Sequence, residues 1–395
     1  MTKLEKFLLF ITSGIYLGIA IFSYSYVDLN LTLSNNQQAL SFVKMMQQLG
    51  YYNRPAASLV YILLMTSAFI VFCYSLYLAK KGQITLTFLI RISLITSLIL
   101  VFSYPFLSSD IFNYMFDAKI ITFYNLSPYT HKALDFPSDD WIRFMRWTHR
   151  YSPYGPIWLL LTTIPSVLSF NKFILDLILF KFLLTIFNLF NIFLIYKISI
   201  GIKRINTILA TTFYALNPLF LIEGIANGHN DVLVATFTLI TILLIQKEKW
   251  LKSFLALILG ALIKYINILM LPGILIYRVN KNIRHFLIIN LLIISAFTII
   301  ISTFHFKIQV LSSSTQVQFQ PWYLFWVAPY LAFFSESIFI LPAITLAFGS
   351  EMRYLPFIYN GDWNAPYSIL YMQSVIIVPL LITTLLVLLK SKIFK

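Results

Sequence analysis

The chain contains few charged residues, fewer acidic ones and almost no cysteine. Charged residues make up 11% of the 395 residues, with 14 Asp and Glu against 29 Lys and Arg. The single cysteine, Cys73, lies in an apolar run, which excludes an intramolecular disulfide and argues against redox chemistry. The sequence also has no Gly-rich phosphate loop and no low-complexity linker. These absences argue against a soluble nucleotide-binding domain and favour one membrane domain over residues 1–395.

Apolar residues dominate what is present. Hydrophobic residues make up 59% of the chain, and the mean hydropathy is +0.82. Apolar runs of about 20 residues recur, the signature of an all-α protein with several membrane spans. The net charge of +15 does not indicate nucleic acid, because most Lys and Arg flank the apolar runs, as they do in cytoplasmic loops. We expect membrane lipids, and no nucleic acid, as partners.

The apolar runs and their flanking charges predict about ten spans plus a short helical hairpin. The run at 156–170 is short for the hydrocarbon core, so we expect a juxtamembrane or re-entrant helix there. The segment 251–277 is bounded by basic residues at both ends, which predicts a hairpin with Lys264 near its tip. The ten runs expected to span are 7–27, 56–78, 85–104, 173–198, 206–224, 231–246, 285–303, 321–335, 337–350 and 368–389.

On this topology the carboxylates gather on one side of the membrane. Glu5 and Glu248 are expected in the cytoplasm, whereas ten others are expected at the outer face. The densest group lies between Ser108 and Tyr154, within an outer loop at 105–155. The asymmetry predicts a chemical site in that loop. The ten are Asp28, Asp110, Asp117, Asp135, Asp139, Asp140, Glu223, Asp231, Glu351 and Asp362.

Asp110 is the leading catalytic candidate. It follows a span that ends near Pro105, at the depth of a lipid headgroup, where a partly desolvated carboxylate can act as a general base. The alternative is that Ser108, Ser109 or Asp110 only caps the following helix. Asp117, two helical turns further on, is a candidate substrate-binding residue on the same face. Its alternatives are pairing with Lys119 or contact with solvent.

The stretch DDWIRFMRWTHR at 139–150 alternates aromatic residues with arginines. Its spacing predicts an amphipathic interfacial helix in which Arg143, Arg146 and Arg150 share one face. These arginines are candidates to hold a lipid phosphate, or simply to meet ordinary headgroups.

Three further features follow along the chain: a polar segment, a single lysine and an aromatic run. The segment EGIANGHND, residues 223–231, reads as a tight, exposed connection that carries His229 and Asp231. One His and one Asp are too few ligands for a metal site, so no metal ligand is predicted, although a divalent cation remains an open alternative. Lys264 is the one cation centred in an apolar hairpin, where it can meet a phosphate or snorkel to the surface. The aromatic run QVQFQPWYLFW at 316–326 fits an interfacial belt or sugar stacking.

In order, these segments resemble the GT-C superfamily of polytopic glycosyltransferases, and most closely the bacterial polyprenol-phosphate-mannose-dependent alpha-mannosyltransferases. The resemblance covers about two-thirds of the chain. In two places the sequence departs from the family pattern: Phe112 stands where some relatives have the second Asp of a DxD motif, and SPY replaces NPY. The matching pieces are SSDIFNYMFDAK, NLSPY, YSPYGP, LNPLFLIEGIANGHND, ALIKY and QPWYLFW.

The resemblance implies that Asp110 is the catalytic base. It further implies that a hexose, expected to be mannose, is transferred from a polyprenyl-phosphate sugar to a glycan or glycolipid. The transfer would invert the anomeric carbon and take place on the outer face of a bacterial plasma membrane. Some of Arg143, Arg146, Arg150 and Lys264 would hold the phosphate, and Tyr151, His229, Asp231 and Trp322 would shape the sugar pocket. The rival hypotheses are a transporter or lipid flippase, and a non-catalytic lipid-binding scaffold.

Overall fold

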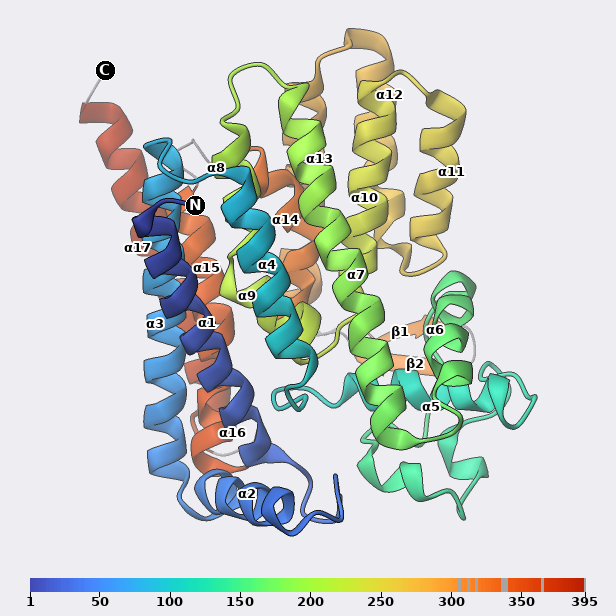
Figure 1. Cartoon of the computed structure of the whole chain (residues 1–395). Coiled ribbons are helices and arrows are strands. Elements are labelled where there is room, and N and C mark those ends of the chain that lie inside the picture. The colour runs from blue at the N-terminus through green and yellow to red at the C-terminus, as the bar shows by residue number, and fades with distance from the viewer. Residues whose placement is uncertain (304–306, 311–312, 317–318, 335–339, 364–365, 394–395) are drawn as a thin grey trace. The chain divides into compact units, whose positions relative to one another are not determined.

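The computed structural model describes residues 1–303, 307–310, 313–316, 319–334, 340–363 and 366–393. Within these residues the regular structure is helical apart from one antiparallel hairpin, in which β1 (Lys307–Val310) pairs with β2 (Ser313–Gln316) (Figure 1). Its internal contacts divide it into two compact units. The first consists of Met1–Leu107, Lys203–Ala226 and Leu331–Lys395, and the second of Ser108–Ile202 and Asn227–Tyr330.

Five helices in the described residues are long and apolar enough to cross a membrane. A sixth span is formed if α8 (Thr207–Ala215) and the segment Pro218–Ala226, bent by 50° against each other, count as one. The helical membrane fold is therefore confirmed, but the count of about ten spans is not. The five long helices are α1 (Lys3–Ser23), α3 (Arg54–Lys80), α7 (Phe173–Ile200), α13 (Ile283–Thr303) and α17 (Ser368–Ile393).

Other expected spans are shorter helices. A helix rises 1.5 Å per residue, so a helix of fewer than about 18 residues does not cross a 30 Å core unaided. We find α4 (Leu86–Val101), α10 (Asp231–Gln246), α14 (Leu324–Ala332) and α15 (Ile340–Met352) in this class.

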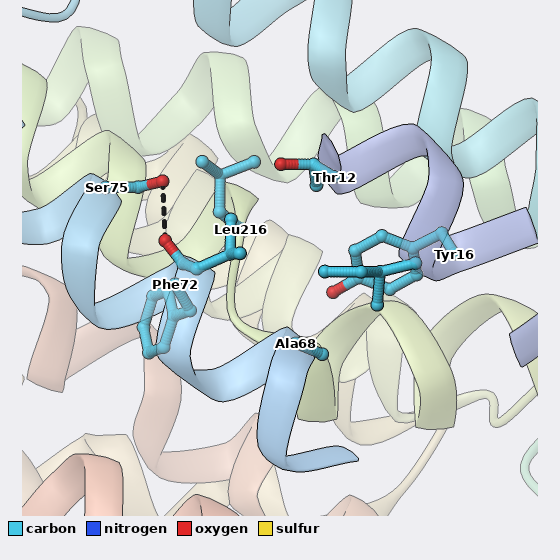
Figure 2. Close-up of a pocket in the computed structure, with 8 residues that line it drawn as sticks. Thr12, Tyr16, Ala68, Phe72, Ser75 and Leu216 are labelled. Atoms are coloured by element: carbon cyan, nitrogen blue, oxygen red, sulfur yellow. Dashed lines mark hydrogen bonds between the residues drawn. The ribbon is translucent and has the colours of Figure 1, made fainter. Parts of the chain in front are cut away.

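The first unit is closely packed where α1 meets α3. Figure 2 shows the small cavity between them, where Tyr16 of α1 faces Ala68 and Phe72 of α3. Its volume of about 10 Å³ is no larger than one water molecule requires. This unit also holds two short helices that the hydropathy pattern does not predict, α2 (Gln37–Gln47) and α16 (Leu355–Asn360). The cavity has no room for a sugar.

The second unit contains the predicted outer loop. Its α5 (Asp110–Thr122) packs against α6 (Pro156–Leu168) and α7, and α10 packs between α7 and α11 (Trp250–Ala261). The prediction of a short helix after Pro156 is confirmed, since α6 has 13 residues.

The predicted hairpin at 251–277 is also confirmed. The chain breaks after α11, at Leu262, and continues as the 3-10 helix η6 (Tyr265–Met270) and α12 (Leu271–Asn280). Lys264 stands at this break.

The prediction of an amphipathic helix at 139–150 is wrong. Only the 3-10 helix η4 (Asp140–Phe144) forms, after which the backbone becomes extended at Met145. The Asp139 carboxylate caps η4 by accepting a hydrogen bond from the Trp141 backbone N–H (2.9 Å), and the Trp141 ring is buried beneath the Lys119 ammonium at 4.0 Å. Because the helix ends before Met145, Arg143, Arg146 and Arg150 do not share a helix face.

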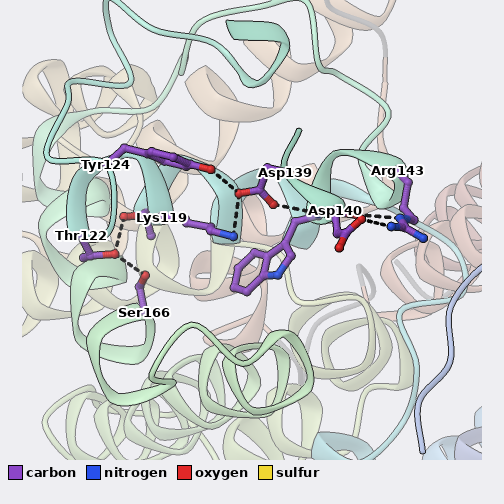
Figure 3. Close-up of polar contacts among 9 residues, drawn as sticks. Lys119, Thr122, Tyr124, Asp139, Asp140, Arg143 and Ser166 are labelled. Carbon is purple, nitrogen blue, oxygen red and sulfur yellow. Dashed lines mark hydrogen bonds and ion pairs between the residues drawn. The ribbon is translucent and has the colours of Figure 1, made fainter. Parts of the chain in front are cut away.

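A buried ion pair fastens this loop to α5, as Figure 3 shows. Lys119 Nζ lies 2.7 Å from Asp139 Oδ2, which also accepts a hydrogen bond from the Tyr124 hydroxyl at 2.7 Å. Burial alone would raise the pKa of Asp139, but the Lys119 ammonium and the hydrogen bonds hold that pKa below its ordinary value. The carboxylate therefore stays charged, and the loop is held rigidly against the helix that carries Asp110.

Candidate active site

Asp110 is the first residue of α5. The N-cap position before it belongs to Ser109, whose side chain makes no capping bond. The Asp110 carboxylate, 16% exposed, instead accepts a hydrogen bond from the indole Nε1 of Trp147 at 3.3 Å and lies 3.9 Å from His229 Nδ1. The alternative in which Asp110 serves as the helix cap is therefore not what the structure shows.

Gly228 brings His229 to this carboxylate. Its φ of +77° belongs to the left-handed region, and a Cβ there would lie 2.5 Å from the Ile111 side chain of α5. Only glycine allows this turn to pass so close to the helix. His229 itself is buried, with its ring stacked on Trp322 at 3.8 Å. With Trp147, which donates to Asp110, these residues form a first cluster of Asp110, Trp147, His229 and Trp322.

Lys264 and Asp231 form a second cluster, at the start of α10. Lys264 Nζ lies 2.6 Å from Asp231 Oδ2, and the indole Nε1 of Trp326 donates to Asp231 Oδ1 at 2.6 Å. The Asp231 side chain is fully buried, whereas that of Lys264 is 20% exposed. Lys264 therefore does not simply snorkel to the surface, because it neutralises a buried carboxylate.

A close backbone contact joins this second cluster to α5. The N–H of Gly155 donates to the carbonyl of Ile263 at 3.2 Å, and a Cβ on Gly155 would overlap the carbonyl oxygen of Leu262. The contact places the Tyr154 ring 5.9 Å from Lys264 Nζ, and the same ring packs edge-on against Tyr114 of α5 at 5.0 Å. The glycine of YSPYGP is thus needed for close approach.

Asp117 lies two turns below Asp110 on α5 and is buried. Burial raises the pKa of Asp117 to about 7, against the opposing effects of Ser152 and of the Arg150 charge. Asp117 does not pair with Lys119, whose ammonium binds Asp139. Asp117 is therefore a buried acid close enough to Ser152 and Arg150 for both to affect its pKa.

Three predicted phosphate or sugar ligands lie apart from both clusters in the described contacts. Arg143 pairs with Asp140 on η4, and the Arg146 side chain is exposed. The Tyr151 ring lies 5.7 Å from the ammonium of Lys132. Arg150 is nearer, since its guanidinium covers the indole of Trp147 at 4.8 Å.

The segment EGIANGHND is not an exposed connection. Every residue from 223 to 231 is buried. Glu223 belongs to the first unit, where it accepts a hydrogen bond from the Tyr354 hydroxyl at 2.8 Å, whereas His229 and Asp231 belong to the second. The sequence placed them together because it could not show that the chain passes from one unit to the other after Ala226.

Three aromatic residues of the site were not predicted as site residues. Trp147 lies in the stretch predicted to form an interfacial helix, Trp326 in the aromatic run expected to form an interfacial belt or to stack on a sugar, and Tyr154 in the motif YSPYGP. The signal that could have identified the tryptophans is chemical, because a buried or half-buried indole N–H requires an acceptor. In the part of the chain that the structure describes, no three His, Cys, Asp or Glu side chains gather as a metal site would require.

Comparison with known proteins identifies the family. The MptA_B family model, described as the alpha-(1->6)-mannopyranosyltransferase N-terminal domain, matches residues 12–280. This range includes Asp110, Trp147, His229, Asp231 and Lys264, which contribute to the two clusters. No curated protein and no solved structure matches the chain. Since the family model covers more than half of its length, the chain belongs to the MptA_B family of alpha-(1->6)-mannopyranosyltransferases.

Proposed function

We propose that this membrane protein transfers mannose from a polyprenyl-phosphate sugar to a hydroxyl group of a glycan or glycolipid on the non-cytoplasmic face. The family description supports the sugar and the reaction class. The observation that carries the proposal is the Asp110 carboxylate, partly exposed at the start of α5 and bordered by an indole donor and an imidazole.

Asp110 acts as the general base. It takes the proton of the acceptor hydroxyl as that oxygen attacks the anomeric carbon, and the bond between this carbon and the phosphate oxygen breaks with its electron pair leaving on polyprenyl phosphate. Attack opposite the leaving group inverts the configuration. An ionised carboxylate offers about four lone-pair sites, so the single hydrogen bond from Trp147 leaves room for the incoming hydroxyl.

The leaving phosphate is met by N–H donors and by a helix dipole, since Asp231 already balances the charge of Lys264. An ammonium has three N–H donors, and Asp231 uses one of those on Lys264, whose side chain keeps access to solvent. The N-terminus of α10, a helix of 16 residues, adds the positive end of its dipole at the same place. A phosphate held here lies beside His229 and Trp322, which would border the sugar.

The direction in which the site faces follows from the charge pattern. Basic residues such as Lys80, Lys81, Lys247 and Lys249 mark the cytoplasmic ends of the apolar segments. The loop with Asp110 then lies on the opposite face, where a membrane-bound donor is available without a soluble nucleotide. A bacterial plasma membrane fits this arrangement.

The proposal is tested with the purified protein in proteoliposomes, radiolabelled polyprenyl-phosphate mannose and a glycolipid acceptor extract. Asp110→Asn should lower the transfer rate at least about 100-fold, the contribution typical of a general base. Asp135→Asn, which changes an exposed acid of the same loop, is the matched control and should keep wild-type activity. Full activity of Asp110→Asn would overturn the mechanism.

If the wild-type protein transfers no mannose, glucose or arabinose, the transferase proposal fails. Uptake of the labelled lipid or sugar into the same vesicles, measured with and without a membrane potential, would then support transport instead.

A further inference from the structure

Trp147 is a half-exposed aromatic residue beside the candidate base. Its side chain is 43% exposed, although its Nε1 donates to Asp110 at 3.3 Å and the Arg150 guanidinium lies 4.8 Å from the ring centroid. The edge of the indole is therefore hydrogen-bonded to the carboxylate and the Arg150 guanidinium lies over one face, so the remaining exposed part of the side chain is open to a ligand. An open aromatic surface next to a reactive group is typical of ligand-binding sites.

The position of this indole is fixed by the backbone around it. The Asn113 side chain on α5 donates to the Trp147 carbonyl at 3.2 Å, and the next carbonyl, that of Thr148, accepts a hydrogen bond from the Leu134 N–H at 3.2 Å. The Ser152 N–H is likewise bonded to the Pro128 carbonyl at 2.9 Å. Because the segment is held at these points, a ligand that lies on the ring does not have to order it first.

A sugar ring has the chemistry that this surface requires. One face of a hexose presents C–H groups, which carry partial positive charge and favour the electron-rich face of an indole, while its edge presents hydroxyl groups. A hexose stacked on the open part of Trp147 has its hydroxyl edge near Asp110, because the carboxylate is bonded to the edge of the same indole.

We propose that Trp147 forms the acceptor subsite, on which a hexose unit of the acceptor stacks and presents its hydroxyl to Asp110. The assignment to the acceptor rests on the proposed function, in which Asp110 takes the proton of the acceptor. The phosphate of the donor is met elsewhere, at Lys264 and the start of α10. The occupant is therefore a neutral hexose ring, and the subsite discriminates by ring shape more than by charge.

Two substitutions of Trp147 distinguish the contribution of its ring face from that of its N–H group. Trp147→Ala removes both, and we expect the KM for the acceptor to rise about tenfold, the effect of losing roughly one good aromatic contact, with the KM for the donor unchanged. Trp147→Phe keeps a ring but lacks the N–H bonded to Asp110. It should keep the acceptor KM within about twofold and lower kcat, because the carboxylate loses the donor that orients it.

The control is Phe170→Ala, which removes an exposed aromatic residue between α6 and α7 and should leave both KM values unchanged. A wild-type acceptor KM in Trp147→Ala would overturn the proposal and leave Trp147 as a membrane-interface anchor only. An equal rise in both KM values would also overturn it, since that result indicates a structural role.

Binding without turnover separates this proposal from the proposed function. Saturation-transfer NMR with an α-linked mannobioside as the probe should show sugar signals for the wild type and for Asp110→Asn, and lose them in Trp147→Ala. This result supports the subsite even if no donor is ever turned over. If the wild type gives no signal, or Trp147→Ala gives the same signal, the subsite does not exist.

Discussion

Breaking the ion pair between Lys264 and Asp231 should have unequal effects, depending on which partner is removed. The two side chains meet at 2.6 Å, but Asp231 is fully buried and Lys264 is 20% exposed. Lys264→Met leaves a buried carboxylate whose remaining hydrogen bond in the described contacts comes from Trp326. Asp231→Asn leaves an ammonium that can reach water.

The magnitudes follow from this difference in burial. Loss of one partner of a buried pair costs about 3–5 kcal/mol, and we expect Lys264→Met to lie near the lower end because Trp326 still supports the carboxylate. Asp231→Asn should cost about 1 kcal/mol, the scale of one net hydrogen bond, since an amide oxygen can still accept from the indole. The double variant should cost less than the sum, by about 1–3 kcal/mol.

The assay is unfolding in detergent or bicelles, followed at several denaturant concentrations for the wild type, both single variants and the double variant. Activity is recorded in parallel, because Lys264 is also proposed to meet the phosphate. Equal costs of the two single substitutions, or a double variant equal to their sum, would refute the view that burial of Asp231 makes the pair asymmetric.

Three further predictions follow from the second unit. Burial raises the pKa of Asp117 from 3.8 to about 7, so between these values the folded protein keeps a proton that the unfolded chain releases. The free energy of unfolding should therefore fall as pH rises from about 4 to 7 and level off above pH 7. In an unfolding series from pH 4.5 to 8, Asp117→Asn should remove this fall. Gly155→Ala should destabilise by about 1–3 kcal/mol and lower activity, because the added methyl overlaps the Leu262 carbonyl; an unfolding midpoint equal to the wild type would contradict this. Lys119→Met should loosen the loop next to Asp139, and hydrogen exchange of residues 133–144 should rise while that of α10 stays unchanged.

Much of the fold can be predicted from local pattern. The long apolar helices, the short helix after Pro156 and the break at Lys264 follow from run length and from the positions of charged residues, because membrane helices satisfy their own backbone hydrogen bonds. The pattern fails at residues 139–150. Helical spacing of arginines and aromatics is present there, but the structure forms only the short 3-10 helix at 140–144, and the backbone is extended at Met145.

The sequence by itself determined that the chain is a helical membrane protein of a mannosyltransferase family, and it identified Asp110, His229, Asp231 and Lys264 as residues of interest. Only the tertiary structure decided their partners. It placed Glu223 beside Tyr354, paired Lys264 with Asp231, and brought the Trp147 N–H to Asp110. The reason is physical. These contacts require close approaches between segments that are distant in sequence. Periodicity and composition indicate which side chains are buried, but they do not indicate which distant side chain each one contacts.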